Sequence, residues 1–323
     1  MKNRYKAIIV IICVLLVSVT LLAIFGLIES KLNKSDGLNG TGNINQNGEI
    51  VYKGEKYVRK NDIQSLLLIG IDSSVNDENT TDNTAADFLL LLVMDRADKT
   101  WKLIHINRDT MTEIKQLDKY GNAVKRFDGQ ITLSHTYGST PIMRGYNTLY
   151  STEKLLYGVN IEHFMSMTMD AVSIINDGLG GIEVEVLHDF SSVAPELVMG
   201  EKILLKGDLA LTYVRSRSGM EDSSNVSRME RQKQYLSALV KKMSEVDNDK
   251  ILSVMNNASQ YTESECTVER LSSILSTIHD FEYEGIYSIE GESVKGESYM
   301  EFYPDETALQ ELVIDIFYKK SNN

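Results

Sequence analysis

One uncharged apolar stretch near the N-terminus constrains this chain more than any other feature of its sequence. Residues 7–28 read AIIVIICVLLVSVTLLAIFGLI and contain no charged side chain. A bilayer core is spanned by about 20 apolar residues, whereas the core of a cleaved signal peptide has about 7–15. Lys2, Arg4 and Lys6 precede the stretch, so the positive-inside rule places residues 1–6 in the cytoplasm. The sequence predicts a single-pass membrane anchor with all later residues outside the cell membrane; a long cleaved signal peptide is the alternative.

The charge balance limits the partners of the exported part. The whole chain has a formal net charge of −13, and residues 1–28 hold three cationic and no acidic side chains, which leaves −16 on the rest. Such a surface repels phosphate backbones and argues against a nucleic-acid partner. Cys13 falls within the predicted anchor and Cys266 in the exported part, so a disulfide scaffold is excluded.

Alternation of strand-like and helix-like segments predicts the fold class. Residues 33–50 are rich in Gly and Asn, so we expect a flexible tether over 29–61. The apolar runs at 66–71 and 88–94 are typical of strands covered on both faces. The expected fold is α/β: one three-layer domain with a central mixed sheet flanked by helices over 62–245. Residues 246–323 are a mainly helical extension that either follows this domain or is part of it.

The expected elements of this domain are short and regularly spaced. Further strands are expected at 101–106, 163–169, 182–186, 285–289 and 298–303. Helices are expected at 146–157, 171–179, 227–243, 250–258 and 268–281, with a last helix after Pro304 that has Asp305 as its N-cap.

Arginines are concentrated in one short window. Four of the 11 arginines, Arg215, Arg217, Arg228 and Arg231, lie within 215–231. If the TYVRSRS stretch is extended, Arg215 and Arg217 point to one face. Arg228 and Arg231 share one face of the following helix, next to Gln232. These side chains can line a cleft that binds an anion, or they can form a solvated basic face paired with nearby acids.

The start of that helix strengthens the anion interpretation. Ser227 and Glu230 fit a capping box, with Ser227 as the N-cap. Two arginines then follow in the first turn, where the helix dipole already disfavours cations. An anion bound there would relieve this conflict, because free N–H groups and guanidinium groups would converge on it.

Acidic residues next to two predicted strands suggest a metal. Asp72 follows the strand at 66–71, and Asp87 precedes the strand at 88–94. Two carboxylates combined with substrate phosphates suit Mg²⁺, although either residue alone can be a turn or cap residue. Directly after the strand at 101–106, Arg108 is held by a rigid element and Asp109 can orient it. Together with the arginines, these residues suggest a metal–diphosphate site.

The order and spacing of these segments resemble the LytR–CpsA–Psr family of membrane-anchored cell-wall glycopolymer transferases. The resemblance covers residues 62–245, and its most specific parts are NRDT (107–110), YVRSRS (213–218) and SRMERQ (227–232). It implies transfer of a teichoic acid or capsular polysaccharide from a polyprenyl diphosphate carrier to a peptidoglycan hydroxyl, which forms a phosphodiester. It also implies an apolar pocket for the polyprenyl chain and a location on the outer face of the membrane.

The resemblance assigns roles to the residues that match the family motifs. Asp72 and Asp87 would hold Mg²⁺. Arg108, Asp109 and Arg217 would be catalytic, Asp109 by orienting Arg108. The diphosphate would be bound by Arg108, Arg215, Arg217, Arg228, Arg231 and Gln232.

Two departures from the family pattern keep other functions open. Ala86 and Phe88 flank Asp87 where the family has Arg and Thr, and Asn107 stands in the usual place of a proline. A non-catalytic sensor of polyprenyl-diphosphate glycans and a polyprenyl diphosphate hydrolase are therefore alternatives. No residue is evident as the general base.

Overall fold

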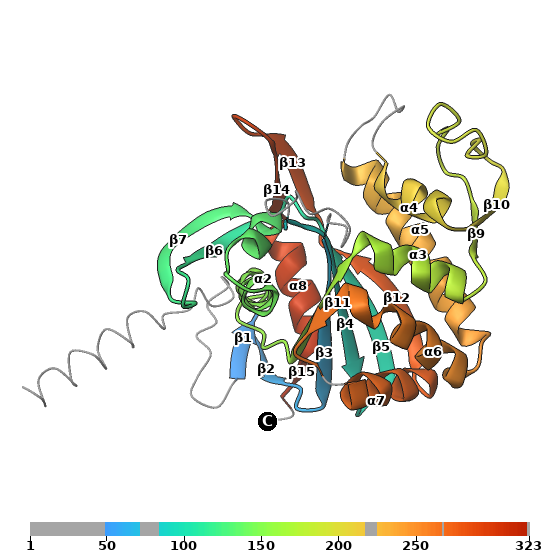
Figure 1. Ribbon diagram of the computed structural model, residues 1–323. Helices are drawn as coiled ribbons and strands as arrows, with labels where there is room; N and C mark the ends of the chain where they lie inside the picture. Colours follow the sequence, from blue (N-terminus) through green and yellow to red (C-terminus); the bar gives the residue numbers. More distant parts are fainter. Residues whose placement is uncertain (1–48, 72–83, 217–224, 267, 322–323) are drawn as a thin grey trace, which may run out of the picture. The chain divides into compact units, whose positions relative to one another are not determined.

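The computed structural model describes residues 49–71, 84–216, 225–266 and 268–321 (Figure 1). They fall into a small unit that includes residues 49–58 and a large unit, Arg59–Lys319. The expected anchor at 7–28 lies outside the described residues, as do Asp72 and Arg217. Within the described ranges, no helix is long and apolar enough to cross a membrane.

A β-hairpin occupies part of the predicted tether. It consists of β1 (Glu49–Tyr52) and β2 (Glu55–Arg59), which pair antiparallel. Lys53 and Gly54 make the turn with φ angles of 49° and 82°, the left-handed values that two-residue hairpin turns require. Ile50 and Tyr52 are buried. The tether prediction is therefore wrong for residues 49–59, because alternating apolar side chains around a Gly-containing turn outweigh the polar composition.

A six-stranded mixed sheet forms the centre of the large unit. Its strands are β3 (Ile63–Ile71), β4 (Ala86–Asp95), β5 (Thr100–Ile106), β8 (His163–Thr168), β11 (Thr262–Ser264) and β12 (Glu282–Ser288). The spatial order is β11-β8-β3-β4-β5-β12. β8 is parallel to β3 and β12 to β5, and the other neighbours are antiparallel. The expected central mixed sheet is confirmed, and segments after residue 245 form both of its edges.

Helices cover both faces of this sheet. They are α2 (Pro141–Leu155), α3 (Met169–Gly178), α5 (Asn225–Ser244), α6 (Asn248–Ala258), α7 (Val268–His279) and α8 (Glu306–Phe317). Figure 1 shows α2 and α8 on one side and the other four on the opposite side. Leu67 and Leu91 point toward the first side and are fully buried, whereas their neighbours Leu66 and Leu90 line a pocket on the second. Because helices cover both faces of the sheet, these consecutive residues of β3 and β4 must all be apolar.

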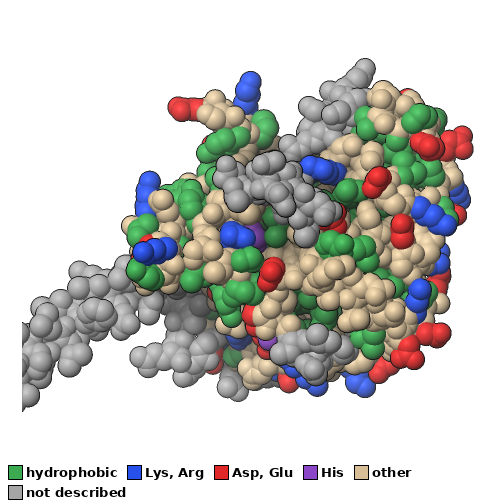
Figure 2. Space-filling view, viewed as in Figure 1, with side chains coloured by type: hydrophobic (Ala, Val, Ile, Leu, Met, Phe, Trp, Pro, Cys, Tyr) green, Lys and Arg blue, Asp and Glu red, His purple; other side chains and the backbone are tan. Residues whose placement is uncertain are grey.

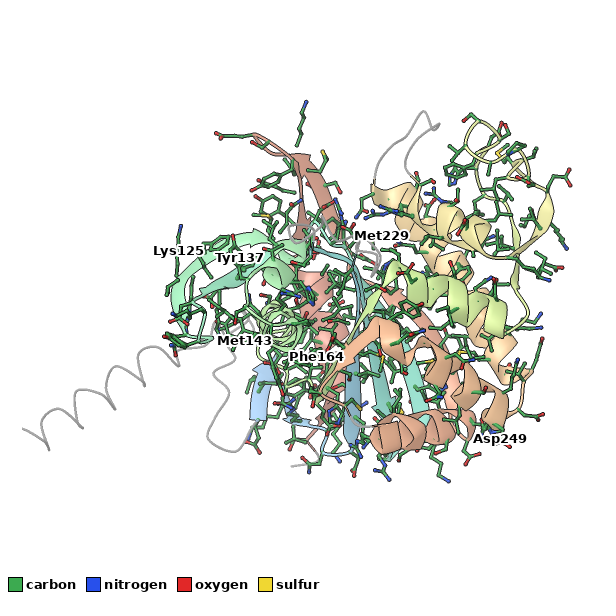
Figure 3. The ribbon with its side chains drawn as sticks, viewed as in Figure 1. Lys125, Tyr137, Met143, Phe164, Met229 and Asp249 are labelled. Carbon is green, nitrogen blue, oxygen red and sulfur yellow. The ribbon has the colours of Figure 1, made fainter. Side chains whose placement is uncertain are left out.

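Helix α2 packs closely onto β8 through a glycine. The fully buried Phe164, labelled in Figure 3, lies where a Cβ on Gly145 would come within 1.9 Å of its ring. The helix begins five residues before the predicted residue 146, because the Thr140 side chain accepts a hydrogen bond from the Met143 N–H and Pro141 occupies the first turn. At the last helix, Asp305 caps α8 as predicted by accepting from the Ala308 N–H at 2.9 Å.

A smaller core fixes the helices that carry the arginine window. β9 (Ile182–Glu185), β10 (Lys202–Leu205) and α4 (Asp208–Arg215) surround the buried Phe190, Tyr213 and Tyr235 together with α5. The condition that the TYVRSRS stretch is extended is not met up to Arg215, because these residues end α4, from which Tyr213 packs into this core. Ser227 is not the N-cap, since α5 already includes Asn225.

Two hairpins border the loop that follows β5. They are formed by β6 (Met111–Leu117) with β7 (Ala123–Gln130), which precedes the short helix η1 (Ile131–Thr136), and by β13 (Gly291–Lys295) with β14 (Met300–Pro304). The Phe302 N–H donates to the Asp109 carbonyl at 2.9 Å, and Thr110 bridges to Phe302. A C-terminal strand thus holds the NRDT segment in place. The strand β15 (Tyr318–Lys320) follows α8.

Candidate lipid diphosphate-binding site

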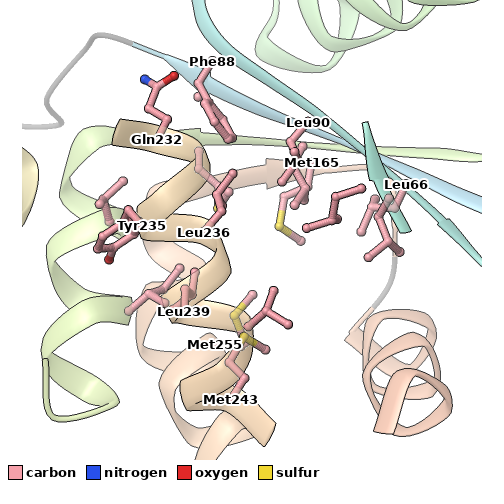
Figure 4. A pocket seen from close by; sticks show the side chains of 18 of the residues that line it. Leu66, Phe88, Leu90, Met165, Gln232, Tyr235, Leu236, Leu239, Met243 and Met255 are labelled. Carbon is pink, nitrogen blue, oxygen red and sulfur yellow. The ribbon is translucent and has the colours of Figure 1, made fainter. Parts of the chain in front are cut away.

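An apolar pocket of about 630 Å³ lies between the sheet and the helices α3, α5, α6 and α7 (Figure 4). The sheet contributes Leu66, Leu90 and Trp101 to its wall, and α5 contributes Leu236 and Val240. These side chains belong to the cluster that also packs the sheet against α5 and α7. A pocket of this size and lining has room for a flexible apolar chain, whose burial is favourable and demands no polar partner.

Polar side chains gather at one end of this pocket. Asp87, Arg215, Arg228 and Gln232 all line it there. They come from the start of β4, the end of α4 and the first turns of α5. The fold brings these three segments together at one end of the central strands. An amphiphile with an apolar tail and an anionic head would find a matching group at each end. We call this polar end the mouth.

Arg108 is held at the mouth by two carboxylates. It donates to Asp87 Oδ1 through Nη1, and its Nε lies 3.4 Å from Asp109 Oδ1. Asp109 is 7% exposed and accepts at 3.0 Å from the Gln130 side chain. Because this oxygen faces both Arg108 and Gln130, Asp109 is suited to orienting Arg108, as we expected, rather than to taking a proton from a substrate.

Arg231 differs from the other predicted anion ligands because it is fully buried. Its guanidinium donates to the carbonyls of Tyr213 (2.9 Å), Ser216 and Ser227 (3.2 Å) and lies 4.4 Å from the Phe190 ring centroid. It ties α4 to α5 and does not line the pocket. The structure thus gives Arg231 a structural position and removes it from the predicted diphosphate ligands.

Arg228 and Gln232 reach the mouth from one face of α5. Arg228 is 5% exposed and donates to Asn225 Oδ1. Gln232 donates through Nε2 to the Val214 carbonyl at 3.1 Å, which links it to α4. Arg215, the last residue of α4, is exposed. The mouth therefore combines one fixed and one more exposed guanidinium.

His105 lies behind the mouth and was not singled out in the sequence. It is 2% exposed, its ring centroid is 5.2 Å from that of Phe88, and its imidazole hydrogen bonds Gln232. Burial, reinforced by the nearby Arg228 and Lys233 charges, lowers the pKa of His105 to about 4. The imidazole is therefore neutral at pH 7. Residues 101, 103 and 105 of β5 point to the same face of the sheet, and Trp101 and Leu103 line the pocket. This alternation could have predicted from the sequence that His105 faces the pocket.

Of the two predicted Mg²⁺ ligands, Asp87 lies among the described residues. Asp87 places a carboxylate at the mouth, and Mg²⁺ characteristically combines one or two protein carboxylates with water and substrate phosphate oxygens. Asp72 lies outside the described residues, within which no group of three or more His, Cys, Asp or Glu side chains could hold a metal. Asp87 fits the requirement, and Mg²⁺ binding belongs to the proposal below.

Several arginine side chains meet at or beside the mouth, together with the carboxylate of Asp87. On the face drawn in Figure 2, basic and acidic side chains are interspersed. Among the residues that the structure describes, Asp87, Arg108, Arg215, Arg228 and Gln232 meet at or beside the mouth, as expected. Fold and site together define an α/β protein with an apolar pocket that ends in an arginine-lined polar mouth.

Comparison with known proteins identifies the family. A profile of the LytR_cpsA_psr family matches residues 28–314, and the chain belongs to this family. The polyisoprenyl-teichoic acid–peptidoglycan teichoic acid transferase TagU of Halalkalibacterium halodurans is 29% identical over 177 residues, 55% of this chain and 52% of that protein. TagU of Enterococcus faecalis is 28% identical over 200 residues, 62% of this chain and 57% of that protein. The chain thus matches little more than half the length of these relatives.

Solved structures share the fold. Bacillus subtilis TagV superposes with a TM-score of 0.61 at 23% identity, over 79% of this chain and 96% of that one. The Streptococcus agalactiae protein gbs0355 gives a TM-score of 0.64 at 19% identity, over 81% and 90%. A structure of TagT bound to LI-WTA gives 0.60 at 20% identity, over 79% and 90%.

Proposed function

We propose that this protein is a membrane-anchored phosphotransferase that moves a glycopolymer from a polyprenyl diphosphate carrier onto peptidoglycan. The observation that carries the proposal is the continuity of the apolar pocket with a mouth lined by Arg215, Arg228, Gln232 and Asp87. The relatives named above are teichoic acid transferases, and teichoic acid or capsular polysaccharide is the donor class that we infer. The predicted anchor at 7–28 would confine the enzyme to the membrane that holds its lipid-linked donor.

The chemistry needs positioning and charge neutralisation more than covalent participation by the protein. An acceptor hydroxyl oxygen of peptidoglycan forms a bond to the sugar-side phosphorus, and the bond from this phosphorus to the bridging oxygen breaks. The products are a phosphodiester and polyprenyl phosphate, and the hydroxyl proton leaves to solvent.

Arginine is suited to this task because its planar guanidinium donates two hydrogen bonds to a phosphate. Arg108 and Arg228 would hold the diphosphate and Arg215 would add charge at its exposed side; Arg217, outside the described residues, remains a proposed ligand. Asp87 and Asp72 would hold Mg²⁺, which when bound neutralises charge on the phosphate oxygens.

A turnover measurement tests the proposal and separates its alternatives. The full-length protein in detergent is incubated with Mg²⁺ and a polyprenyl diphosphate-linked glycan, with and without peptidoglycan, and polyprenyl phosphate release is measured. We expect release that requires peptidoglycan, with the glycan joined to the wall polymer. Release without acceptor identifies a hydrolase, and binding without release identifies a sensor; either contradicts the transferase.

Matched arginine variants locate the activity. Arg108→Ala should lower turnover at least 10³-fold, the order of magnitude of one well-placed arginine in phosphoryl transfer. Arg126→Ala removes an exposed arginine of β7 and should leave turnover unchanged.

A further inference from the structure

Two asparagine side chains connect the NRDT segment to the start of α5. Asn107 is 2% exposed, and its Oδ1 accepts from the Asp109 N–H at 3.0 Å and from Asn225 Nδ2 at 2.5 Å. Asn225 in turn accepts through Oδ1 from Arg228 Nη2. A continuous chain of hydrogen bonds therefore runs from the backbone next to Arg108 to the guanidinium of Arg228.

An amide at position 225 suits this chain of hydrogen bonds. Asn225 donates on one side and accepts on the other, and its NH₂ group and carbonyl oxygen serve the two partners from separate atoms. Asn107 must accept two hydrogen bonds in a site closed to water. The two residues are 118 positions apart in the sequence and lie on different elements, so the bond between them is a tertiary link.

The backbone on either side of Asn107 is also fixed. Its carbonyl accepts from the Thr110 N–H at 3.0 Å and from the Thr110 hydroxyl at 2.6 Å. On the far side of the segment, Phe302 of β14 donates to the Asp109 carbonyl at 2.9 Å. Arg108 therefore projects from a loop whose position relative to α5 is set through Asn225.

We propose that Asn107 and Asn225 are positioning residues, which set the separation of the Arg108 and Arg228 guanidinium groups so that both bind one diphosphate. The inference rests on the proposed function and adds to it the link that makes the two arginines one site. Arginine side chains are flexible, and a preset geometry reduces the ordering that binding requires. Neither asparagine contacts the ligand in this account.

The test compares the affinity for a charged and an uncharged form of the same lipid. Calorimetry on the full-length protein in detergent gives Kd for geranylgeranyl diphosphate and for geranylgeraniol, and their ratio measures recognition of the diphosphate. Asn107→Leu and Asn225→Ala should each lower this preference about tenfold, the size of one charge-assisted hydrogen bond. The double variant should lose no more than either single variant, because both break the same link.

Asn147→Leu is the matched control. Asn147 is equally buried, and its side-chain NH₂ group donates to the carbonyls of Lys115 and Ser134 from α2, which lies on the opposite side of the sheet from the pocket. This variant should lower the unfolding temperature and leave the preference for diphosphate unchanged. If Asn107→Leu fails to fold, Asn225→Ala still decides, since alanine is favoured in a helix and position 225 is only partly buried.

Three outcomes overturn the inference. A wild-type preference in Asn225→Ala, or losses that multiply in the double variant, would show that the asparagines do not act as one link. An equal loss of affinity for both lipids would show a structural role only. If the wild-type protein itself does not prefer the diphosphate, the proposed function fails, and the inference fails with it.

Discussion

Arg215 and Arg231 carry the same cationic group, but their surroundings give them different roles. Arg231 is fully buried and its donors point at backbone carbonyls, whereas Arg215 is exposed at the mouth of the pocket. A buried cation is stable only while its hydrogen-bond partners remain, because water cannot replace them. An exposed cation contributes little to folding, because water can replace its partners, and it can contact an anionic ligand.

The same substitution at both positions separates these roles. Arg231→Met removes the guanidinium that donates to three backbone carbonyls in a largely buried site and should lower the free energy of unfolding by about 3–5 kcal/mol. Arg215→Met should change it by less than about 0.5 kcal/mol and weaken geranylgeranyl diphosphate binding. Chemical denaturation and calorimetry measure the two effects. Equal losses of stability in both variants would contradict the assignment.

The lowered pKa values of two buried histidines predict how the free energy of unfolding depends on pH. Burial lowers the pKa of His105 and of His135 to about 4 from an ordinary value of 6.5. Between these values the unfolded chain binds a proton that the folded chain does not, so stability falls as pH decreases from about 6.5 toward 4. Each histidine contributes up to about 3 kcal/mol to this fall.

The contribution of one histidine can be isolated by difference. His135→Gln should flatten the dependence of unfolding free energy on pH between about 6.5 and 4, relative to the wild-type protein. Denaturant titrations at several pH values measure it. An unchanged slope would mean that folding does not lower the pKa of His135.

At the residue scale, the sequence predicted which side chains of the site would be held near the mouth in some cases and missed them in others. Arg108 was predictable because it directly follows a strong strand pattern, and Arg228 because it begins an amphipathic helix. The burial of Arg231 was not, since Arg228 and Arg231 are adjacent on the helix surface and only the cluster around Phe190 distinguishes them. The bond between Asn107 and Asn225 depends on tertiary contact, which no local pattern reports.

At the scale of elements, long apolar runs were predicted well. β6, β7 and β13 were missed, whereas β14 was predicted by the strand expected at 298–303. β3, β4 and β5 are recognisable because both faces are covered, so the runs are apolar throughout. β7 and β13 are largely exposed and β6 is mostly half-buried, so the sequences of these strands alternate only weakly. α4 was missed because only two of its side chains, Ala210 and Tyr213, are buried.

Close packing of α2 on β8 gives a prediction at this scale. Gly145→Ala places a methyl group against the Phe164 ring and should destabilise the fold by about 1–3 kcal/mol, although alanine is otherwise favoured in a helix. Phe164→Leu removes the clash, so the double variant should be more stable than the sum of the two single effects predicts. Thermal unfolding of the wild-type protein, the two single variants and the double variant measures this coupling. Strict additivity would show that the Phe164 ring does not cause the destabilisation by Gly145→Ala.

At the scale of the whole molecule, the proposed function depends on a cavity that the fold leaves between a sheet and four helices. Its walls are the same side chains that form the core, so the sequence pattern of a core residue and of a lipid contact is identical. Sequence alone therefore could not locate the pocket, although the resemblance to the family implied one. The segments after residue 245 supply α6, α7 and β12 to this architecture.

Filling the cavity should separate binding of the lipid chain from binding of the head group. Leu236→Trp places an indole in the pocket and should raise Kd for geranylgeranyl diphosphate at least tenfold, with Kd for inorganic pyrophosphate unchanged. Leu252→Trp makes the same change on the exposed side of α6 and should affect neither. Equal affinity of the Leu236→Trp and wild-type proteins for the lipid would place the chain elsewhere.

A crystal structure of the protein with a bound polyprenyl diphosphate tests the central claim most directly. We predict density for the prenyl chain between Leu90 of the sheet and Leu236 of α5, with the diphosphate contacted by Arg108 and Arg228. Density for the lipid on another surface, or a diphosphate placed away from both arginines, would contradict the account.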